Sequence, residues 1–250
     1  MKKTMKWAAG ITGGVVGACV IGLAVTGWQI GWGPFHFLFK GFEGDVRAIE
    51  QRYDPESRRG EIVFYGASNF RLWKEMDEDL SAYKVQNHGF GGSTDRMLMQ
   101  YADRILYPYE PKIVVFQTGS NDLANLPGTR EEKLAACLSD KREMFALFHA
   151  RLPDTQFIVM SGLLLPGRSQ YTEMTQEINR QLREMCEVSE YMTFVDAEDF
   201  TFDGTDYAEE LFISDGIHLT HEARLRWRDE YILPALERVI EENGFDDLRR

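Results

Sequence analysis

Short apolar runs alternate with longer amphipathic stretches over residues 61–242, and this alternation leaves few folds open. The runs are rich in β-branched and aromatic residues, which is typical of buried strands. They cover residues 62–65, 84–87, 113–117, 156–161 and 192–195. Apolar residues then recur with the helical period over residues 95–106, 131–150, 174–187 and 222–240. Strands that alternate with helices predict a parallel sheet covered by helices on both faces.

The length and charge of the chain limit what such a domain can be. A chain of 250 residues suits one α/β domain. Its net charge is −12. Residues 1–40 contain four lysines and no Asp or Glu, so the rest of the chain has a more negative net charge than the whole. This balance argues against a nucleic-acid surface. Cys19, Cys137 and Cys186 form no zinc or CxxC pattern, and we expect the last two to be buried free thiols.

The N-terminal segment, residues 1–32, has the features of a membrane anchor. No Asp, Glu, Lys or Arg occurs from Trp7 to Phe39, and three lysines precede this stretch. About 20 apolar residues span a bilayer, and lysines favour the cytoplasmic side. We therefore expect a signal-anchor helix at about residues 8–28, with the N-terminus cytoplasmic and the remaining chain extracytoplasmic. The alternative is a cleaved signal peptide, which would give a secreted protein.

The regions that flank the predicted domain carry weaker signals. Residues 33–60 are expected to form a juxtamembrane connector with a short helix over 45–53 and a polar loop. Residues 243–250 are expected to form a frayed C-terminal tail.

Four polar stretches follow the predicted strands or precede the last helix. They are Gly66–Asn69, Gly89–Gly92, Gly119–Asp122 and Asp215–His218. Ser68 lies on a glycine turn just after a strand, which places its hydroxyl at the edge of the sheet where open α/β folds bind ligands. Because carboxyl ends of parallel strands meet at one edge, we expect the four stretches to converge there.

The residue types in these stretches suit acyl chemistry. Asp215 and His218 are three residues apart, so the carboxylate can accept the Nδ1–H of the imidazole and leave Nε2 as a base. The backbone N–H of Gly92 and the side-chain amide of Asn121 are uncharged donors for an oxyanion. Each stretch alone is an ordinary turn or helix cap, and only their combination predicts a site.

Together the four stretches resemble the conserved blocks of the SGNH hydrolase superfamily, also called GDSL-like esterases and lipases. The resemblance covers roughly residues 61–236. It implies that Ser68 is the nucleophile, that His218 is the base oriented by Asp215, and that Gly92 and Asn121 complete an oxyanion hole with the Ser68 N–H. It also implies a flavodoxin-like, three-layer α/β/α fold with five parallel strands, and no metal or cofactor.

The sequence departs from the family signature at the first block. Gly-Asp-Ser-Leu is replaced by Gly66-Ala67-Ser68-Asn69, so the aspartate is absent, although it is not the nucleophile. An α/β-hydrolase elbow, Gly-x-Ser-x-Gly, is excluded because residue 70 is Phe.

The sequence therefore predicts a membrane-anchored serine esterase that acts on acyl or acetyl esters of small molecules, lipids or glycans. Residues near the nucleophile or after the fourth strand are candidates for substrate contacts: Phe70, Trp73, Phe90, Leu164 and, for an anionic group, Arg168. Two alternatives remain open. One is an acyltransferase that uses the same triad on envelope glycans, and the other is a catalytically silent envelope-binding module.

Overall fold

The computed structural model describes residues 42–250. The anchor predicted at residues 8–28, Cys19 and the first part of the connector lie outside the described residues. None of the helices within residues 42–250 has the length and apolar character needed to cross a membrane. Residues Asp45–Arg250 form a unit with its own core.

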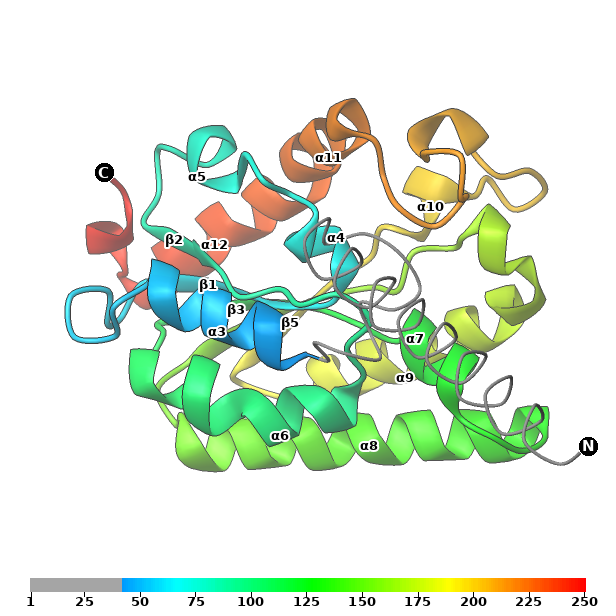
Figure 1. Cartoon of the computed structure of the whole chain (residues 1–250), viewed down its shortest axis with the longest axis horizontal. Helices are drawn as coiled ribbons and strands as arrows, with labels where there is room; N and C mark the ends of the chain where they lie inside the picture. The colour runs from blue at the N-terminus through cyan, green and yellow to red at the C-terminus, as the bar shows by residue number, and fades with distance from the viewer. Residues whose placement is uncertain (1–41) are drawn as a thin grey trace, which may run out of the picture. The chain divides into compact units, whose positions relative to one another are not determined.

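Five parallel strands form one sheet, as the alternation predicts (Figure 1). The order is β2-β1-β3-β4-β5, and the bounds are Val85–Asn87, Ile62–Gly66, Ile113–Gln117, Gln156–Met160 and Met192–Val195. Each bound differs from its prediction by at most one residue. The chain moves outward from β1 to β2 and then returns to β3, so the strand order reverses between β1 and β3. In doubly wound sheets, the crevice at this switch point is where ligands bind.

Helices cover both faces of the sheet. In Figure 1, α11 and α12 lie on one side of the strands and α6 and α8 on the other. The helices are α3 (Glu43–Arg52), α4 (Ser68–Arg71), α5 (Met76–Asp79), α6 (Asp95–Ile105), α7 (Ser120–Asn125), α8 (Arg130–Arg151), α9 (Thr172–Glu187), α10 (Glu198–Thr201), α11 (His221–Trp227) and α12 (Leu233–Asn243). Short 3-10 turns are η1 (Tyr107–Tyr109), η2 (Pro166–Tyr171), η3 (Glu209–Leu211) and η5 (Asp246–Leu248). The three-layer arrangement is the one that the family resemblance implies.

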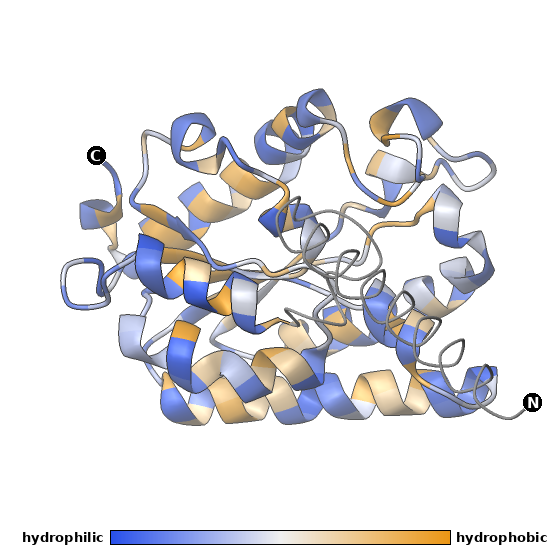
Figure 2. Ribbon diagram, viewed as in Figure 1, coloured by the Kyte–Doolittle hydropathy of each residue, from blue (hydrophilic) through white to orange (hydrophobic). Residues whose placement is uncertain are grey.

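Alternate strand residues pack on opposite faces, because side chains alternate along a strand. Ile62 and Phe64 of β1 share a core cluster with Leu236 of α12. On the other face, Phe116 of β3 contacts Phe145 of α8, with ring centroids 5.1 Å apart. In Figure 2, hydrophobic residues gather along the strands at the centre, whereas hydrophobic and hydrophilic residues alternate along the surrounding helices.

Most predicted helices are confirmed, and α6 begins as expected. The Oγ1 of Thr94 accepts a hydrogen bond from the Met97 N–H at 3.4 Å, so Thr94 is the N-cap. The final helix, expected to be continuous, is instead interrupted by a π-helical turn, η4 (Arg228–Ile232). Pro234 explains the interruption, because it has no N–H to donate to the carbonyl four residues before it.

The C-terminus is not frayed, and that expectation is wrong. Leu248 is buried, and its carbonyl accepts a hydrogen bond from the Lys84 N–H at 2.9 Å. The Arg250 N–H donates to the Ala82 carbonyl at 2.8 Å, and Lys112 pairs with Asp247 at 2.7 Å. The buried Leu248 side chain, the two backbone hydrogen bonds and the ion pair together hold the last turn against the loop before β2.

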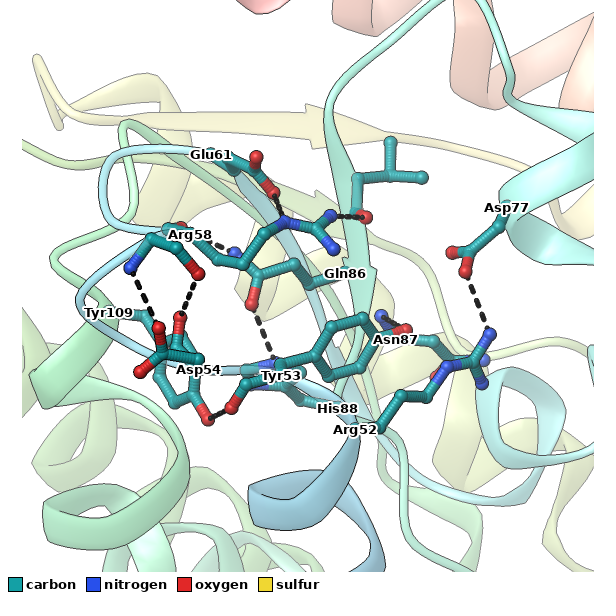
Figure 3. A network of polar contacts seen from close by, with 12 residues as sticks. Arg52, Tyr53, Asp54, Arg58, Glu61, Asp77, Gln86, Asn87, His88 and Tyr109 are labelled. Atoms are coloured by element: carbon teal, nitrogen blue, oxygen red, sulfur yellow. Dashed lines mark hydrogen bonds and ion pairs between the residues drawn. The ribbon is translucent and has the colours of Figure 1, made fainter.

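A polar network holds the segment before β1 against β2 (Figure 3). The Tyr53 hydroxyl accepts a hydrogen bond from the Asn87 N–H at 3.0 Å, and the Tyr109 hydroxyl donates to the Tyr53 carbonyl at 2.9 Å. The Arg58 guanidinium donates to the Val85 carbonyl at 2.8 Å. Next to Asn87, burial lowers the pKa of His88 to about 3, so this imidazole is neutral. The network fixes the end of β2, from which the loop Gly89–Gly92 departs.

Candidate active site

Ser68 lies where β1 ends at the switch point. The preceding strand residue, Gly66, pairs with Gln117 of β3, and a Cβ at position 66 would lie 2.3 Å from the Gln117 carbonyl oxygen. Only glycine permits this close approach of the two strands. Ser68 then begins α4, and backbone N–H groups in a first helical turn have no acceptor within their own helix.

The three residues of the predicted triad lie in hydrogen-bond contact. The distance between the Ser68 Oγ and the His218 Nε2 is 2.8 Å, and that between the His218 Nδ1 and the Asp215 Oδ2 is 2.6 Å. An imidazole that donates its Nδ1–H to a carboxylate leaves Nε2 free to accept the serine proton. The hydroxyl, the imidazole and the carboxylate are thus aligned for proton transfer from Ser68.

Asp215 is held in the charged form by its own loop. Its Oδ1 accepts hydrogen bonds from the N–H groups of Ile217, at 2.8 Å, and His218, at 3.0 Å. Burial raises the pKa of Asp215, but the hydrogen bonds from His218 and Ile217 outweigh it and leave the pKa below its usual value. Gly167 of η2 packs against this loop, because a Cβ there would lie 2.3 Å from the Asp215 carbonyl oxygen.

Asn121, a predicted oxyanion donor, is oriented from both ends of its amide. Its Nδ2 donates to the Ser93 carbonyl at 3.0 Å, and its Oδ1 accepts from the Arg168 Nη1 at 3.1 Å. Arg168 also donates to the Ser120 Oγ at 2.8 Å. Burial lowers the pKa of Arg168 from its very high usual value. The guanidinium therefore directs the amide nitrogen away from itself.

Gly92, the other predicted donor, lies in the loop beside Asn121. Its φ of +79° is in the left-handed region, where glycine is favoured. Gly92 does not line the pocket at Ser68, but the adjacent Ser93 accepts the Asn121 hydrogen bond and donates its hydroxyl to the Gly66 carbonyl at 3.2 Å. The loop is thereby tied to both β1 and α7.

The pocket at Ser68 is small and mixed in polarity. Its volume is about 20 Å³, close to that needed for a single water molecule. Polar walls come from Asn69 and Asn121, and apolar walls from Leu163, Leu165 and Ile217. The Oδ1 of Asn69 is buried without a hydrogen-bond partner among the described residues.

Four of the predicted substrate contacts are corrected by the structure. Phe70, Trp73 and Phe90 are fully buried in the core. The Phe70 ring stacks on Trp227 of α11, with centroids 5.9 Å apart. Leu164 is also buried and does not line the pocket, whereas its neighbours Leu163 and Leu165 do, because alternate residues of an extended segment face opposite sides. Nearness in sequence to Ser68 or to β4 did not indicate which way these side chains point.

Several residues that shape the site were not predicted. Asn87 donates to the carbonyls of Phe70, at 2.7 Å, and Trp73, at 3.1 Å, and accepts the Gly89 N–H at 3.0 Å. Lys141 is fully buried in an ion pair with Asp95. A signal for Lys141 does exist in the sequence, since it lies in helical register with Cys137 and Phe145 on the apolar stripe of α8. Cys137 and Cys186 are buried free thiols, as expected.

Among residues 42–250, no cluster of three or more His, Cys, Asp and Glu side chains is arranged to hold a metal ion.

Comparisons with known proteins give a family match. Residues 62–224 match the model of the GDSL-like Lipase/Acylhydrolase family. No curated protein matches the chain.

Solved structures share the fold. A putative acylhydrolase from Bacteroides fragilis is 17% identical, with a TM-score of 0.66 over 81% of this chain and 98% of that one. A putative platelet activating factor from Streptococcus pneumonia is 18% identical, with a TM-score of 0.62 over 78% and 96%. An acetylxylan esterase from Geobacillus stearothermophilus, solved as a catalytic mutant, is 17% identical, with a TM-score of 0.52 over 68% and 94%.

Proposed function

Because this chain belongs to the GDSL-like lipase/acylhydrolase family, and so is a carboxylic ester hydrolase, we propose that it cleaves short-chain acyl esters with Ser68, His218 and Asp215 as its triad. The observation that carries this proposal is the unbroken chain of hydrogen bonds from the Ser68 Oγ through His218 to Asp215.

The reaction proceeds in two halves. The Ser68 oxygen attacks the ester carbonyl while the His218 Nε2 takes the hydroxyl proton, and the Asp215 carboxylate stabilises the imidazolium. The N–H groups of Ser68 and Gly92 and the Asn121 amide hold the oxyanion. His218 returns the proton to the departing alcohol, which leaves an acyl-serine. Water, which gives a proton to His218, then attacks the acyl-serine. The bond to the Ser68 oxygen breaks, His218 returns the proton to that oxygen, and the carboxylic acid leaves.

The size of the pocket favours a short acyl group. With a volume of about 20 Å³, the pocket has room for little more than one ordered water molecule, so a long acyl chain would require Leu163 or Leu165 to move. Acetyl esters are therefore the first class to test.

The polar walls favour a polar alcohol over a long aliphatic one. Asn69 lines the pocket and has a buried amide oxygen without a hydrogen-bond partner among the described residues, so a substrate hydroxyl that reached this oxygen would supply the missing hydrogen bond. Sugar hydroxyls are donors of this kind, and one fold neighbour is an acetylxylan esterase. We therefore propose acetylated glycans as substrates. In this proposal, Arg168 orients Asn121 and attracts an anionic group on the substrate.

The proposal includes a location. The uncharged stretch at residues 7–39, preceded by three lysines, supports a retained signal anchor that holds the domain outside the cytoplasm. Reporter fusions after residue 40 would be active on the extracytoplasmic side, and carbonate would not extract the protein from membranes. Activity of the fusions in the cytoplasm would contradict this location.

The test of catalysis is Ser68→Ala with Ser120→Ala as the matched control, since both remove a pocket hydroxyl. We expect Ser68→Ala to lose about 10³-fold or more in kcat for p-nitrophenyl acetate and all fluorophosphonate labelling, and Ser120→Ala to keep labelling. Activity should fall steeply from acetate to butyrate to octanoate esters.

Three results would contradict the proposal. Undiminished hydrolysis by Ser68→Ala would exclude this nucleophile, and absence of labelling in the unmodified protein would favour a silent binding module. Formation of acylated sugar at the expense of free acid, when an acceptor glycan is added, would favour an acyltransferase.

A further inference from the structure

Four buried polar residues form a cluster behind the two loops that carry Gly92 and Asn121. Asp95 and Lys141 are fully buried and form an ion pair at 3.0 Å. The Thr118 hydroxyl donates to the Asp95 Oδ1 at 2.5 Å, and the Lys141 Nζ donates to the Thr118 Oγ1 at 3.1 Å. Asp122 completes the cluster, because its Oδ1 accepts the Asp95 N–H at 3.0 Å.

This cluster joins the two loops directly. Asp95 follows Gly92 by three residues, and Asp122 follows Asn121 immediately. The hydrogen bonds from Asp95 to Asp122 and from Thr118 to Asp95 connect the two loops. The hydrogen bond from Asn121 to Ser93 connects the same two loops. Lys141 lies beneath the turn at Gly119, with its Nζ 3.8 Å from the position of a Cβ there. The relative position of the two oxyanion donors therefore depends on this cluster.

The charges of the cluster do not balance if both acids are ionised. Lys141 is a single cation, and it is already paired with Asp95. Asp95 also accepts the hydrogen bond from Thr118. Asp122 is 2% exposed and its Oδ2 has no partner among the described residues. An ionised carboxylate that is buried with an unpartnered oxygen beside another carboxylate is strongly disfavoured.

Resting on the catalytic role proposed for Asn121, we infer that Asp122 is a positioning residue that must remain protonated for the oxyanion hole to work. The electrostatics agree with this inference. Burial, followed by the charge of Asp95, raises the pKa of Asp122 to about 8. Burial lowers the pKa of Lys141, but the charge of Asp95 and its hydrogen bond to the amine act against burial and the pKa is raised overall, so the amine stays charged.

Other ionisable groups near Asp122 do not supply a second cation to the cluster. From α8, Cys137 also faces Asp122, and burial raises the pKa of its thiol to about 12, so it is neutral. Asp140 of α8 is paired with Arg96 at 2.6 Å. Lys133 donates to the Leu123 carbonyl at 3.0 Å. When Asp122 ionises, its charge therefore faces Asp95, and it opposes the negative charge that develops on the substrate oxygen held by the neighbouring Asn121 amide.

The test is Asp122→Asn in the full-length protein, because asparagine keeps the oxygen that accepts the Asp95 N–H and cannot ionise. The kcat of the unmodified enzyme for p-nitrophenyl acetate should fall about 10-fold between pH 7 and pH 9.5. The kcat of Asp122→Asn at pH 9.5 should stay within about twofold of its own value at pH 7. Asp140→Asn, which neutralises another buried carboxylate of the same region, should keep the alkaline fall.

A second readout does not depend on catalysis. A carboxyl whose pKa is raised on folding binds its proton more tightly in the folded state, so stability is lost as the pH rises from about 4 to about 8. The urea midpoint of Asp122→Asn, minus that of the unmodified protein, should therefore increase steadily as the pH rises over this range. Asp140→Asn should show no such gain.

The outcomes separate this inference from the proposed function. An alkaline fall retained in Asp122→Asn would overturn the positioning role, and equal pH dependence of the two urea midpoints would overturn the protonated state. A protein that hydrolyses no ester but shows the widening urea difference would refute the proposed function while leaving the protonated Asp122 in place.

Discussion

The amide of Asn121 is oriented by two unrelated contacts, Arg168 on its oxygen and the Ser93 carbonyl on its nitrogen. Either contact alone would leave the amide free to rotate. Together they hold the amide in one orientation, which is the preorganisation that the oxyanion role proposed for Asn121 requires.

At the scale of this residue, Asn121→Ala should lower kcat by about 10²–10³-fold while the fold is retained, because one preorganised donor is lost. Steady-state kinetics and circular dichroism measure the two effects. Asn125→Ala, at the exposed end of the same helix, is the matched control. A loss of less than about threefold would remove Asn121 from the oxyanion hole.

Sequence reasoning succeeded at residues whose chemistry is shared with a family and failed at those that depend on packing. Ser68, Asp215 and His218 were predicted from motif and spacing, and they lie in contact. Phe70 and Phe90 are candidates for substrate contact by their nearness to Ser68 or to the glycine loop, but both are buried in the core, because a sequence does not show on which side of the sheet a ring will lie. Asp122 appears in the sequence as an ordinary helix acid, and its state depends on Asp95 and Lys141, which are remote along the chain.

Among the elements, the short turn η2 supports the loop that carries Asp215 and His218. Gly167 brings its backbone against the loop that carries Asp215 and His218, and its N–H donates to the Gly216 carbonyl at 2.9 Å. A Cβ at position 167 would lie 2.3 Å from the Asp215 carbonyl oxygen and 2.9 Å from the Ile217 Cγ1, so one of the two segments would have to move.

Gly167→Ala should therefore lower kcat by about 10²-fold, since a displacement of about 1 Å at a catalytic group can have this effect. Kinetics with p-nitrophenyl acetate would measure it. Ser169→Ala on the same turn is exposed and should behave as the unmodified enzyme. Equal kcat values for the two variants would show that the loop tolerates the added methyl group.

The last turn, η5, makes a second prediction for an element. Leu248 is 1% exposed, so Leu248→Ala should reduce the free energy of unfolding by about 2 kcal/mol or more. Urea denaturation would measure this loss. Leu147→Ala, at a leucine that is 40% exposed on α8, should cost much less. Similar values for both would mean that the C-terminal turn contributes little to stability.

Periodicity predicts regular elements well and their irregular ends poorly. The five strands and α6, α8 and α9 were found because burial imposes a repeat on their sequences. The π-helical turn arises from one proline, and the C-terminus is fixed by one buried leucine, two backbone hydrogen bonds and an ion pair, none of which produces a repeat. The folded end of the chain also depends on the loop before β2, which local sequence does not reveal.

For the whole unit, the strand order explains why one site collects residues from three of its four segments. Ser68 follows β1 and Asn121 follows β3, on either side of the switch point, while the Gly92 loop follows β2. The alternation of elements predicted the parallel sheet, and the family resemblance predicted its type. The connection of α3 to the site was not predicted: Asp45 pairs with Arg71 at 2.8 Å and accepts the Gly91 N–H at 3.3 Å.

This connection predicts where the unit can be shortened. A fragment of residues 42–250 should fold and keep its esterase activity, because it retains Asp45 and Tyr53. A fragment of residues 55–250 loses both, and with them the contacts to Gly91 and Asn87, so it should be less active and less stable. Specific activity and thermal unfolding of the two fragments measure the difference. Equal behaviour would show that α3 is dispensable.

Because the charges of Asp95, Asp122 and Lys141 depend on one another, the substitutions found at these positions in related proteins should be correlated. A lineage that replaces the amine with an apolar side chain gains a buried uncompensated charge unless Asp95 is neutralised at the same time. Across descendants of a common ancestor, positions 95 and 141 should therefore exchange together, while position 122 drifts between aspartate and asparagine.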